Sequence, residues 1–295
     1  MNGGSNLQTG EVLRSILIAA ALLFMVKSGF TQSVPTKNLY LCQTPPGNIP
    51  KIFPLAVKQG FFAAERIAIS HDGRDIYYSE LKGYYPNTGE SVKKYTYSDG
   101  KWTGPVTLFE GYAAPALSVT GDTMYVETNF ETYISERNGS GWTKPKRILS
   151  ELDSAHYLQV TRNGNYYIST KSGKGVGLSD WCRVAIKGAD TSTVSLGRPL
   201  NTEGENLDFF VSRDESFMIV TNRPGLGISY RNDDGSWTNP VNFGPVIDFG
   251  LGSWGPWVTP DNKYLFYTTG TKRDYSDVHI YWVRIDGIIE NRIGA

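Results

Sequence analysis

The side chains in this sequence that could do chemistry are acidic, basic and aromatic residues set at roughly even intervals along the chain. They are Glu65, Arg66, Tyr112, Asp153, His156, Glu205, Asp208 and Trp254. Two carboxylates at the correct separation can act as acid and base in glycoside cleavage, and the candidates for such a pair are Asp153, Glu205 and Asp208. Spacing alone assigns no catalytic residue. The candidates for ligand binding by charge, hydrogen bonding and ring contact are Glu65, Arg66, Tyr112, His156, Asp208 and Trp254.

Motifs for other chemistry are absent from the sequence. The glycine-rich segment 173–177 lacks the GxxxxGK[ST] order of a phosphate-binding loop and is followed by no helical pattern. The three histidines, His71, His156 and His279, are dispersed, and neither they nor the cysteines have the spacing of a zinc site. The sequence therefore predicts no metal and no cofactor.

The charge balance disfavours nucleic acid as a partner. The chain carries 29 Lys and Arg against 29 Asp and Glu, for a formal net charge of +0. Nucleic-acid binding requires clustered cations that displace counterions from phosphate, and no basic stripe is present. The same balance gives no basis for binding to a membrane surface.

The first 33 residues have the layout of a secretory signal peptide. Arg14 precedes a short apolar run over residues 16–26, and small or polar residues follow at Ser28, Gly29 and Thr31. We expect cleavage near residues 29–34, no membrane insertion after removal, and a periplasmic or secreted protein; an uncleaved anchor is the alternative. Export would permit a disulfide between Cys42 and Cys182, but nothing in the sequence brings the two cysteines together.

Five similar segments must position the candidate residues. Each has an apolar-alternating strand, a short polar turn and a second strand rich in tyrosine, valine and isoleucine. The segments are 66–78, 114–126, 157–168, 208–220 and 255–267. Strand-built repeats of about 40 to 50 residues are typical of propeller blades. The sequence therefore predicts an all-β propeller, and the direct count gives five blades; a sixth would require further strands from the arm and tail.

The ends of the chain predict how the ring closes. Residues 34–50 are rich in proline and predict an extended arm, and residues 51–295 are expected to form a single propeller domain. The last repeat lacks a fourth strand, whereas residues 51–57 resemble the fourth strands of the other repeats. We expect this N-terminal strand to complete the last blade, because such pairing removes an open seam. The inner strands would then begin at one rim, so that their first residues converge on the mouth of a central channel.

The repeat turns resemble those of a known family. The segments 70–73, 212–215 and 259–262 are similar to the Ser-x-Asp-Gly turns of the WD40-like PD40 propeller repeat, the family of the TolB propeller. Other phrases, such as 233–244 and 279–283, resemble exported propellers of unknown activity from Bacteroidetes-type bacteria. The resemblance implies a propeller fold but not an activity, because this fold hosts binding modules, scaffolds and enzymes.

Three functional hypotheses follow. The first is an exported, non-catalytic binding or scaffolding propeller that presents its channel mouth to a glycan, a peptide or an envelope protein. The alternative is a glycoside hydrolase or lyase of the five-bladed type that uses a carboxylate pair at the channel mouth. A third hypothesis is a purely structural part of a larger secreted complex.

Overall fold

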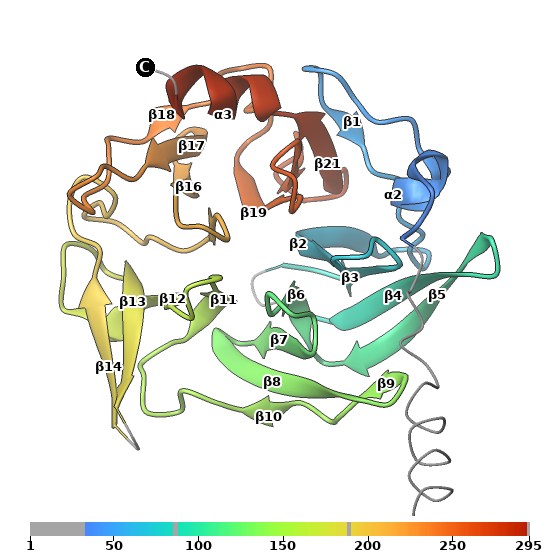
Figure 1. Cartoon of the computed structure of the whole chain (residues 1–295), viewed down its shortest axis with the longest axis horizontal. Coiled ribbons are helices and arrows are strands. Elements are labelled where there is room, and N and C mark those ends of the chain that lie inside the picture. The colour runs from blue at the N-terminus through green and yellow to red at the C-terminus, as the bar shows by residue number, and fades with distance from the viewer. Residues whose placement is uncertain (1–32, 85–87, 188–189, 294–295) are drawn as a thin grey trace, which may run out of the picture. The chain divides into compact units, whose positions relative to one another are not determined.

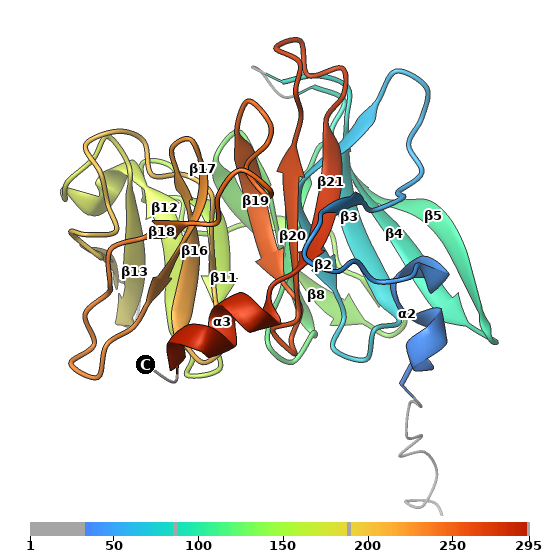
Figure 2. The same ribbon diagram turned by 90° about the horizontal axis from the view of Figure 1, so that it is seen from above.

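The computed structural model describes residues 33–84, 88–187 and 190–293. Residues from Val34 onward form one compact unit. Five antiparallel sheets surround a common centre (Figure 1). In the view turned by 90°, the strands of the sheets lie alongside one another (Figure 2). The protein is an all-β, five-bladed propeller, which confirms the fold predicted from the repeats. The predicted signal peptide lies outside the described residues, apart from Ser33.

Each blade is one sheet whose strands follow one another from the centre outward. Blade 1 contains β2 (Phe62–Ile69), β3 (Asp75–Leu81), β4 (Ser91–Ser98) and β5 (Lys101–Glu110). Blade 2 contains β6 (Ala113–Leu117), β7 (Thr123–Thr128), β8 (Glu131–Asn138), β9 (Gly141–Trp142) and β10 (Lys146–Arg147). Blade 3 contains β11 (His156–Val160), β12 (Tyr166–Thr170), β13 (Asp180–Lys187) and β14 (Asp190–Ser195). Blade 4 contains β15 (Phe209–Val211), β16 (Phe217–Asn222), β17 (Gly225–Tyr230) and β18 (Val241–Asn242). Blade 5 contains β19 (Ser253–Val258), β20 (Tyr264–Thr269), β21 (His279–Arg284) and β1 (Lys51–Ile52).

The helical elements are short and peripheral. They are η1 (Thr36–Asn38), α2 (Leu39–Cys42), η2 (Lys171–Gly173) and α3 (Asp286–Ile293). Within α2, Tyr40 and Leu41 have left-handed backbone angles, and the Tyr40 ring lies 5.3 Å from the ring of Trp282. Among the described residues, no helix has the length and apolar content needed to cross a membrane.

Burial decreases from the centre of each blade to its edge, as the strand patterns require. In blade 1 every residue of β3 is buried, whereas the outer strand β5 is exposed along much of its length. The cores lie between neighbouring sheets: Ile76 and Tyr78 of blade 1 pack with Phe266 and Trp282 of blade 5. The apolar faces of each sheet are shielded from water by the neighbouring sheets. Each blade therefore depends on its neighbours for stability.

The turn between the first two strands of blade 4 has a glutamate where the corresponding turns of blades 1 to 3 have Gly73, Gly121 and Gly164. Glu215 occupies the turn position with a φ of 62°. Its carboxylate accepts hydrogen bonds from Thr161 and Asn165 of blade 3, both at 2.6 Å, and from Arg231 of blade 4 at 2.5 Å. Burial opposes the ionised form, but these donors outweigh it and lower the pKa of Glu215 to about 2. A glycine would ease the backbone but would remove this connection between blades.

The two ends of the propeller meet in blade 5, as predicted. β1 pairs antiparallel with β21, with Lys51 opposite Trp282 and Ile52 opposite Tyr281. The regular strand is shorter than the predicted 51–57, although the amide of Phe53 still donates to the carbonyl of Ile280 at 2.8 Å. Cys42 and Cys182 are both free thiols, the first exposed and the second buried.

Phe53 gives a test of this closure. Its side chain is 2% exposed and packs against the rings of Phe266 and Trp282. We expect Phe53→Ala to lower the free energy of unfolding by about 3–5 kcal/mol, because it leaves a cavity at the seam. The matched control is Ile52→Ala, since Ile52 is 47% exposed and should change stability by less than about 0.5 kcal/mol. Equal losses for the two variants in chemical denaturation would contradict this role for Phe53.

Candidate functional site

Backbone bulges turn the start of the inner strands toward the channel. In blades 1, 2, 3 and 5 the pairing of the first two strands is irregular near a residue with positive φ. These residues are Glu65 (63°), Ala114 (50°), Tyr157 (58°) and Gly255 (60°). A bulge bends its strand and re-aims the side chains beside it. Because the bulges recur at equivalent places in four blades, they bring the channel-facing side chains together.

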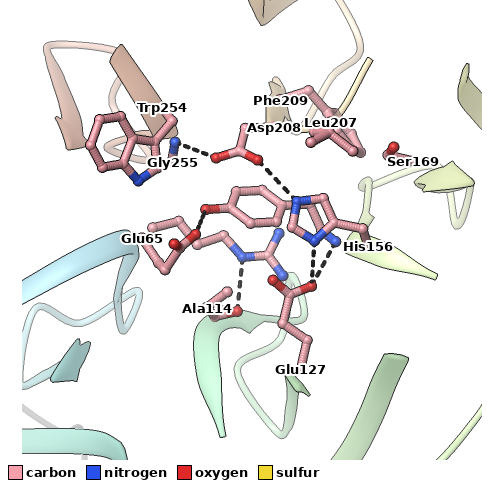
Figure 3. Close-up of polar contacts among 12 residues, drawn as sticks. Glu65, Ala114, Glu127, His156, Ser169, Leu207, Asp208, Phe209, Trp254 and Gly255 are labelled. Carbon is pink, nitrogen blue, oxygen red and sulfur yellow. Dashed lines mark hydrogen bonds and ion pairs between the residues drawn. The ribbon is translucent and has the colours of Figure 1, made fainter. Parts of the chain in front are cut away.

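A protonated histidine lies at the centre of the resulting cluster. His156 of blade 3 contacts Oε2 of Glu127, from blade 2, at 3.0 Å through Nδ1. Its Nε2 lies 2.9 Å from Oδ1 of Asp208, which precedes β15 in blade 4 (Figure 3). All three side chains are buried, with 6–7% exposure. With both ring nitrogens facing carboxylates, the imidazolium donates in both directions.

Glu65 and two tyrosines extend the cluster through blade 1. Tyr157 donates its hydroxyl proton to Oε2 of Glu65 at 2.6 Å, and Tyr84 donates to Oε1 at 2.9 Å. The indole of Trp254, in blade 5, donates to the Tyr84 hydroxyl at 3.0 Å. The amide of the neighbouring Gly255 donates to Oδ2 of Asp208 at 2.8 Å.

Arg66 adds a second buried cation. It is 2% exposed, its Nε donates to the carbonyl of Ala114 in blade 2 at 3.0 Å, and its guanidinium lies 4.5 Å from the centre of the Tyr157 ring. The set Glu65, Arg66, Glu127, His156, Tyr157, Asp208 and Gly255, here called the channel plug, thus contains residues of all five blades. Beyond Arg66 the channel narrows to a cavity of about 50 Å³ lined mainly by apolar side chains of the inner strands. Ligand pockets are usually about 300 Å³ or more, so this part of the channel is much smaller than a typical ligand pocket.

Burial and neighbouring charges shift the plug's titrating groups in defined directions. Burial alone would lower the pKa of His156, but the charge of Glu127 and the hydrogen bonds with Asp208 and Glu127 raise it to about 10. Burial raises the pKa of Glu65 to about 7, and the charge of Asp208 adds to the effect. His156 is therefore charged at neutral pH, while Glu65 is poised between its two forms.

A separate pocket of about 320 Å³ lies next to the plug. It is bordered by the β7–β8 turn of blade 2, the linker into blade 3, and loops of blades 3 and 4. Its lining comprises Asn129, Phe130, Glu131, Arg147, Ile148, Leu149, Leu152, Asp153, Ser154, Ala155, Lys171, Ser179, Glu205 and Leu207. The rings of Phe130 and His156 lie 4.9 Å apart, which joins the pocket to the plug.

The structure divides the residues expected from the sequence into three groups. Glu65, Arg66, His156 and Asp208 belong to the plug, and Trp254 lies beside it. Asp153 and Glu205 are exposed and line the pocket. Tyr112 joins neither group, because its ring packs on Tyr133, 5.1 Å away, in the apolar contact between blades 1 and 2.

Several residues of the site were not among the sequence candidates. Glu127 lies near the end of β7, on a second strand, whereas the sequence candidates lie at or near the starts of first strands. Tyr157 directly follows His156 in β11, and Tyr84 lies in the loop after β3. The signal for Glu127 was available in the repeat, since Glu80 near the end of β3 occupies a similar place in blade 1.

Among the described residues, no group of three or more His, Cys, Asp or Glu side chains is arranged to hold a metal ion. Glu127 and Asp208 contact the ring of His156 instead, and Glu65 accepts hydrogen bonds from the hydroxyls of Tyr84 and Tyr157.

Comparison with known proteins identifies neither a family nor an activity for this chain. No family model matches the chain, and no curated protein matches it; membership of the PD40 repeat family therefore stays a prediction. Similar solved structures include a gluconolactonase of Xanthomonas campestris, with 16% identity, a TM-score of 0.49, and coverage of 81% of this chain and 87% of that one. An oligogalacturonate lyase of Vibrio parahaemolyticus has 14% identity, a TM-score of 0.40, and coverage of 77% and 67%. A TolB-like protein of Agrobacterium tumefaciens has 16% identity, a TM-score of 0.40, and coverage of 62% of both chains. Similarities at this level say nothing about what the present protein binds or converts.

The charged state of His156 predicts a pH dependence of stability. The folded pKa of about 10 lies above the ordinary value of 6.5, so this stabilisation is complete below pH 6.5 and is lost as the pH rises toward 10. One proton held only by the folded state corresponds to a fall of about 1.4 kcal/mol in unfolding free energy per pH unit. We expect this fall in unfolding free energy between pH 6.5 and 9 in the wild type and in His71→Gln, the control that removes an exposed histidine.

His156→Gln should lack this slope. It should also be about 3–5 kcal/mol less stable at pH 6, because two buried carboxylates lose their cation. Denaturant unfolding at a series of pH values measures both effects. Identical slopes for His156→Gln and His71→Gln would show that His156 is not held protonated.

Gly255 predicts a steric effect at the plug. A Cβ on Gly255 would lie 2.6 Å from the carbonyl carbon of Glu65 and 2.8 Å from the amide nitrogen of Arg66, at a φ of 60°. We expect Gly255→Ala to cost at least about 2 kcal/mol of stability, through left-handed strain and backbone overlap. Gly252→Ala is the control, because a Cβ there meets nothing within 4 Å. A Gly255→Ala protein as stable as the control would contradict this close approach of blades 5 and 1.

Proposed function

We propose that the protein is a non-catalytic binding propeller whose ligand site is the pocket beside the channel plug. The ligand would be a glycan, a peptide or a segment of an envelope protein. The observation that carries this proposal is the contrast between the two parts of the channel mouth. The histidine and the carboxylates of the plug are buried and hydrogen-bonded within the protein, whereas the pocket is lined by exposed charged side chains and the exposed ring of Phe130. The signal-like segment at residues 1–33 supports a periplasmic or secreted location.

The plug is poorly suited to bind a ligand directly. A ligand reaching His156 would have to replace its contacts with Glu127 and Asp208, at 3.0 and 2.9 Å. Removing one partner of a buried ion pair costs about 3–5 kcal/mol, which a weak polar ligand does not offset. The plug is better explained as the element that joins the five blades and supports the wall of the pocket.

The backbone around the pocket carries unusual strain. Three of its lining residues that are neither glycine nor asparagine have positive φ: Phe130 (59°), Leu149 (55°) and Ser154 (64°). Such conformations cost free energy and are found preferentially at functional sites. Their gathering around one pocket supports a binding role there.

A hydrolase or lyase is the second candidate. One observation favours it: Asp153 and Glu205 line the same pocket, as an acid and a base acting on one substrate would. Asp208, the third carboxylate considered, is committed to His156 and Gly255 in the plug. If this candidate is correct, the pair would therefore be Asp153 and Glu205.

The binding proposal is tested with the pocket carboxylates. We expect the purified protein to bind members of an oligosaccharide array or a displayed peptide library, and Asp153→Asn/Glu205→Gln to weaken the strongest interaction at least tenfold. Both side chains are exposed, so the double variant should unfold at the same temperature as the wild type. Asp233→Asn, an exposed acid in the β17–β18 loop, is the control and should bind normally. Binding unaffected by the double variant would place the ligand elsewhere.

The same variants distinguish binding from catalysis. The wild type is incubated with the oligosaccharides, and new reducing ends and unsaturated products are measured. We expect no turnover. Turnover that is abolished in the double variant and retained in Asp233→Asn would replace the binding proposal with the hydrolase or lyase.

A further inference from the structure

We propose that Phe130 is a stacking platform for a sugar ring, and that the ligand of the pocket is an uncharged or amino-sugar oligosaccharide. This inference rests on the proposed function and names the ligand class of the same site. Its basis is a phenylalanine at a turn position that favours glycine, with its ring exposed in the pocket.

The turn that holds Phe130 is a two-residue hairpin. Thr128 pairs with Glu131 across it, and the two residues between them, Asn129 and Phe130, have φ values of 51° and 59°. Positive φ at both central positions defines a type I′ turn, for which Asn-Gly is the favoured sequence. The chain therefore has the preferred residue at the first position and an unfavourable aromatic residue at the second.

The packing of the ring explains only in part why phenylalanine occupies this turn position. On one side, Phe130 contacts the imidazole of His156, with ring centres 4.9 Å apart. The side chain is nevertheless 47% exposed and lines the pocket. A residue needed only for packing would be more deeply buried, whereas a platform must leave one face free for a ligand.

The groups around the ring match a carbohydrate. The face of an aromatic ring carries negative potential, and the axial C–H groups of a pyranose have the opposite polarity. Carboxylates and an ammonium group near the ring can accept from and donate to hydroxyl groups. Asp153, Glu205 and Lys171 supply such groups in the pocket.

Charge disfavours an acidic sugar. Arg147 is paired with Glu131 at 2.7 Å, which leaves two carboxylates, Asp153 and Glu205, against one ammonium group on Lys171. The pocket therefore has an excess of negative charge. This excess repels uronates and suits neutral sugars or protonated amino sugars.

The test uses defined oligosaccharides and a substitution that should relieve the turn. Wild type, Phe130→Gly and Phe130→Trp are compared by calorimetry against gluco-, xylo-, manno-, glucosamine and galacturonate oligosaccharides. We expect the wild type to bind at least one neutral or amino-sugar probe and not the galacturonate. Phe130→Gly should bind that probe at least tenfold more weakly while its unfolding temperature stays the same or rises. Phe130→Trp should retain binding, and Phe249→Ala, which removes an exposed aromatic residue outside the pocket, should bind as the wild type does.

Each other outcome overturns the inference. If none of the neutral or amino-sugar probes binds, or if Phe130→Gly binds as tightly as the wild type, Phe130 is not a sugar platform. If Phe130→Gly keeps binding but changes the pH dependence of stability, the ring serves only to shield His156 from water. Peptide binding that is sensitive to Asp153→Asn/Glu205→Gln, with no sugar binding, would preserve the proposed function while rejecting this inference.

Discussion

The structure depends on one buried cation held between two carboxylates. His156 comes from the third blade, Glu127 from the second and Asp208 from the fourth, so that a single imidazolium connects three sheets. The contact stabilises the fold only if all three partners are present, because each buried charge alone would be strongly disfavoured in the interior. The same condition fixes the relative positions of the blades, since a shift of any one of them would leave a buried charge without its partner.

The backbone at the channel mouth follows from this requirement. Left-handed bulges at Glu65, Ala114, Tyr157 and Gly255 are individually unfavourable. They place channel-facing groups where neighbouring blades can pair with them, and the closure of the ring by β1 keeps the strained strands in place. With the centre closed, the surface left for a ligand is the pocket beside it, where Phe130 contacts both His156 and the open space.

The fold could be predicted from the sequence because its signals are local and repeated. The strand-turn-strand pattern occurs five times, and the missing last strand of the final repeat pointed directly to the N-terminal segment. The site was predicted only in part. Residues at the starts of first strands, such as His156 and Asp208, follow from the repeat alone. The position of Glu127 depends on how deeply the second strand of blade 2 reaches into the channel, which no local pattern records. The sequence also could not predict that Asp208 lies in the plug while Asp153 and Glu205 line the pocket. That difference depends on which side chains are paired in the interior and which remain exposed to water.

The central claim is that the channel is closed by a permanently charged His156, and it is tested most directly by NMR of the histidine ring. In the wild-type protein with nitrogen-labelled histidine, the account predicts that the His156 resonances remain those of an imidazolium from pH 5 to pH 8.5. A His156 ring that loses its proton near pH 6.5 would show that the carboxylates do not hold it. The buried ion pairs could then no longer be regarded as the element that joins the blades.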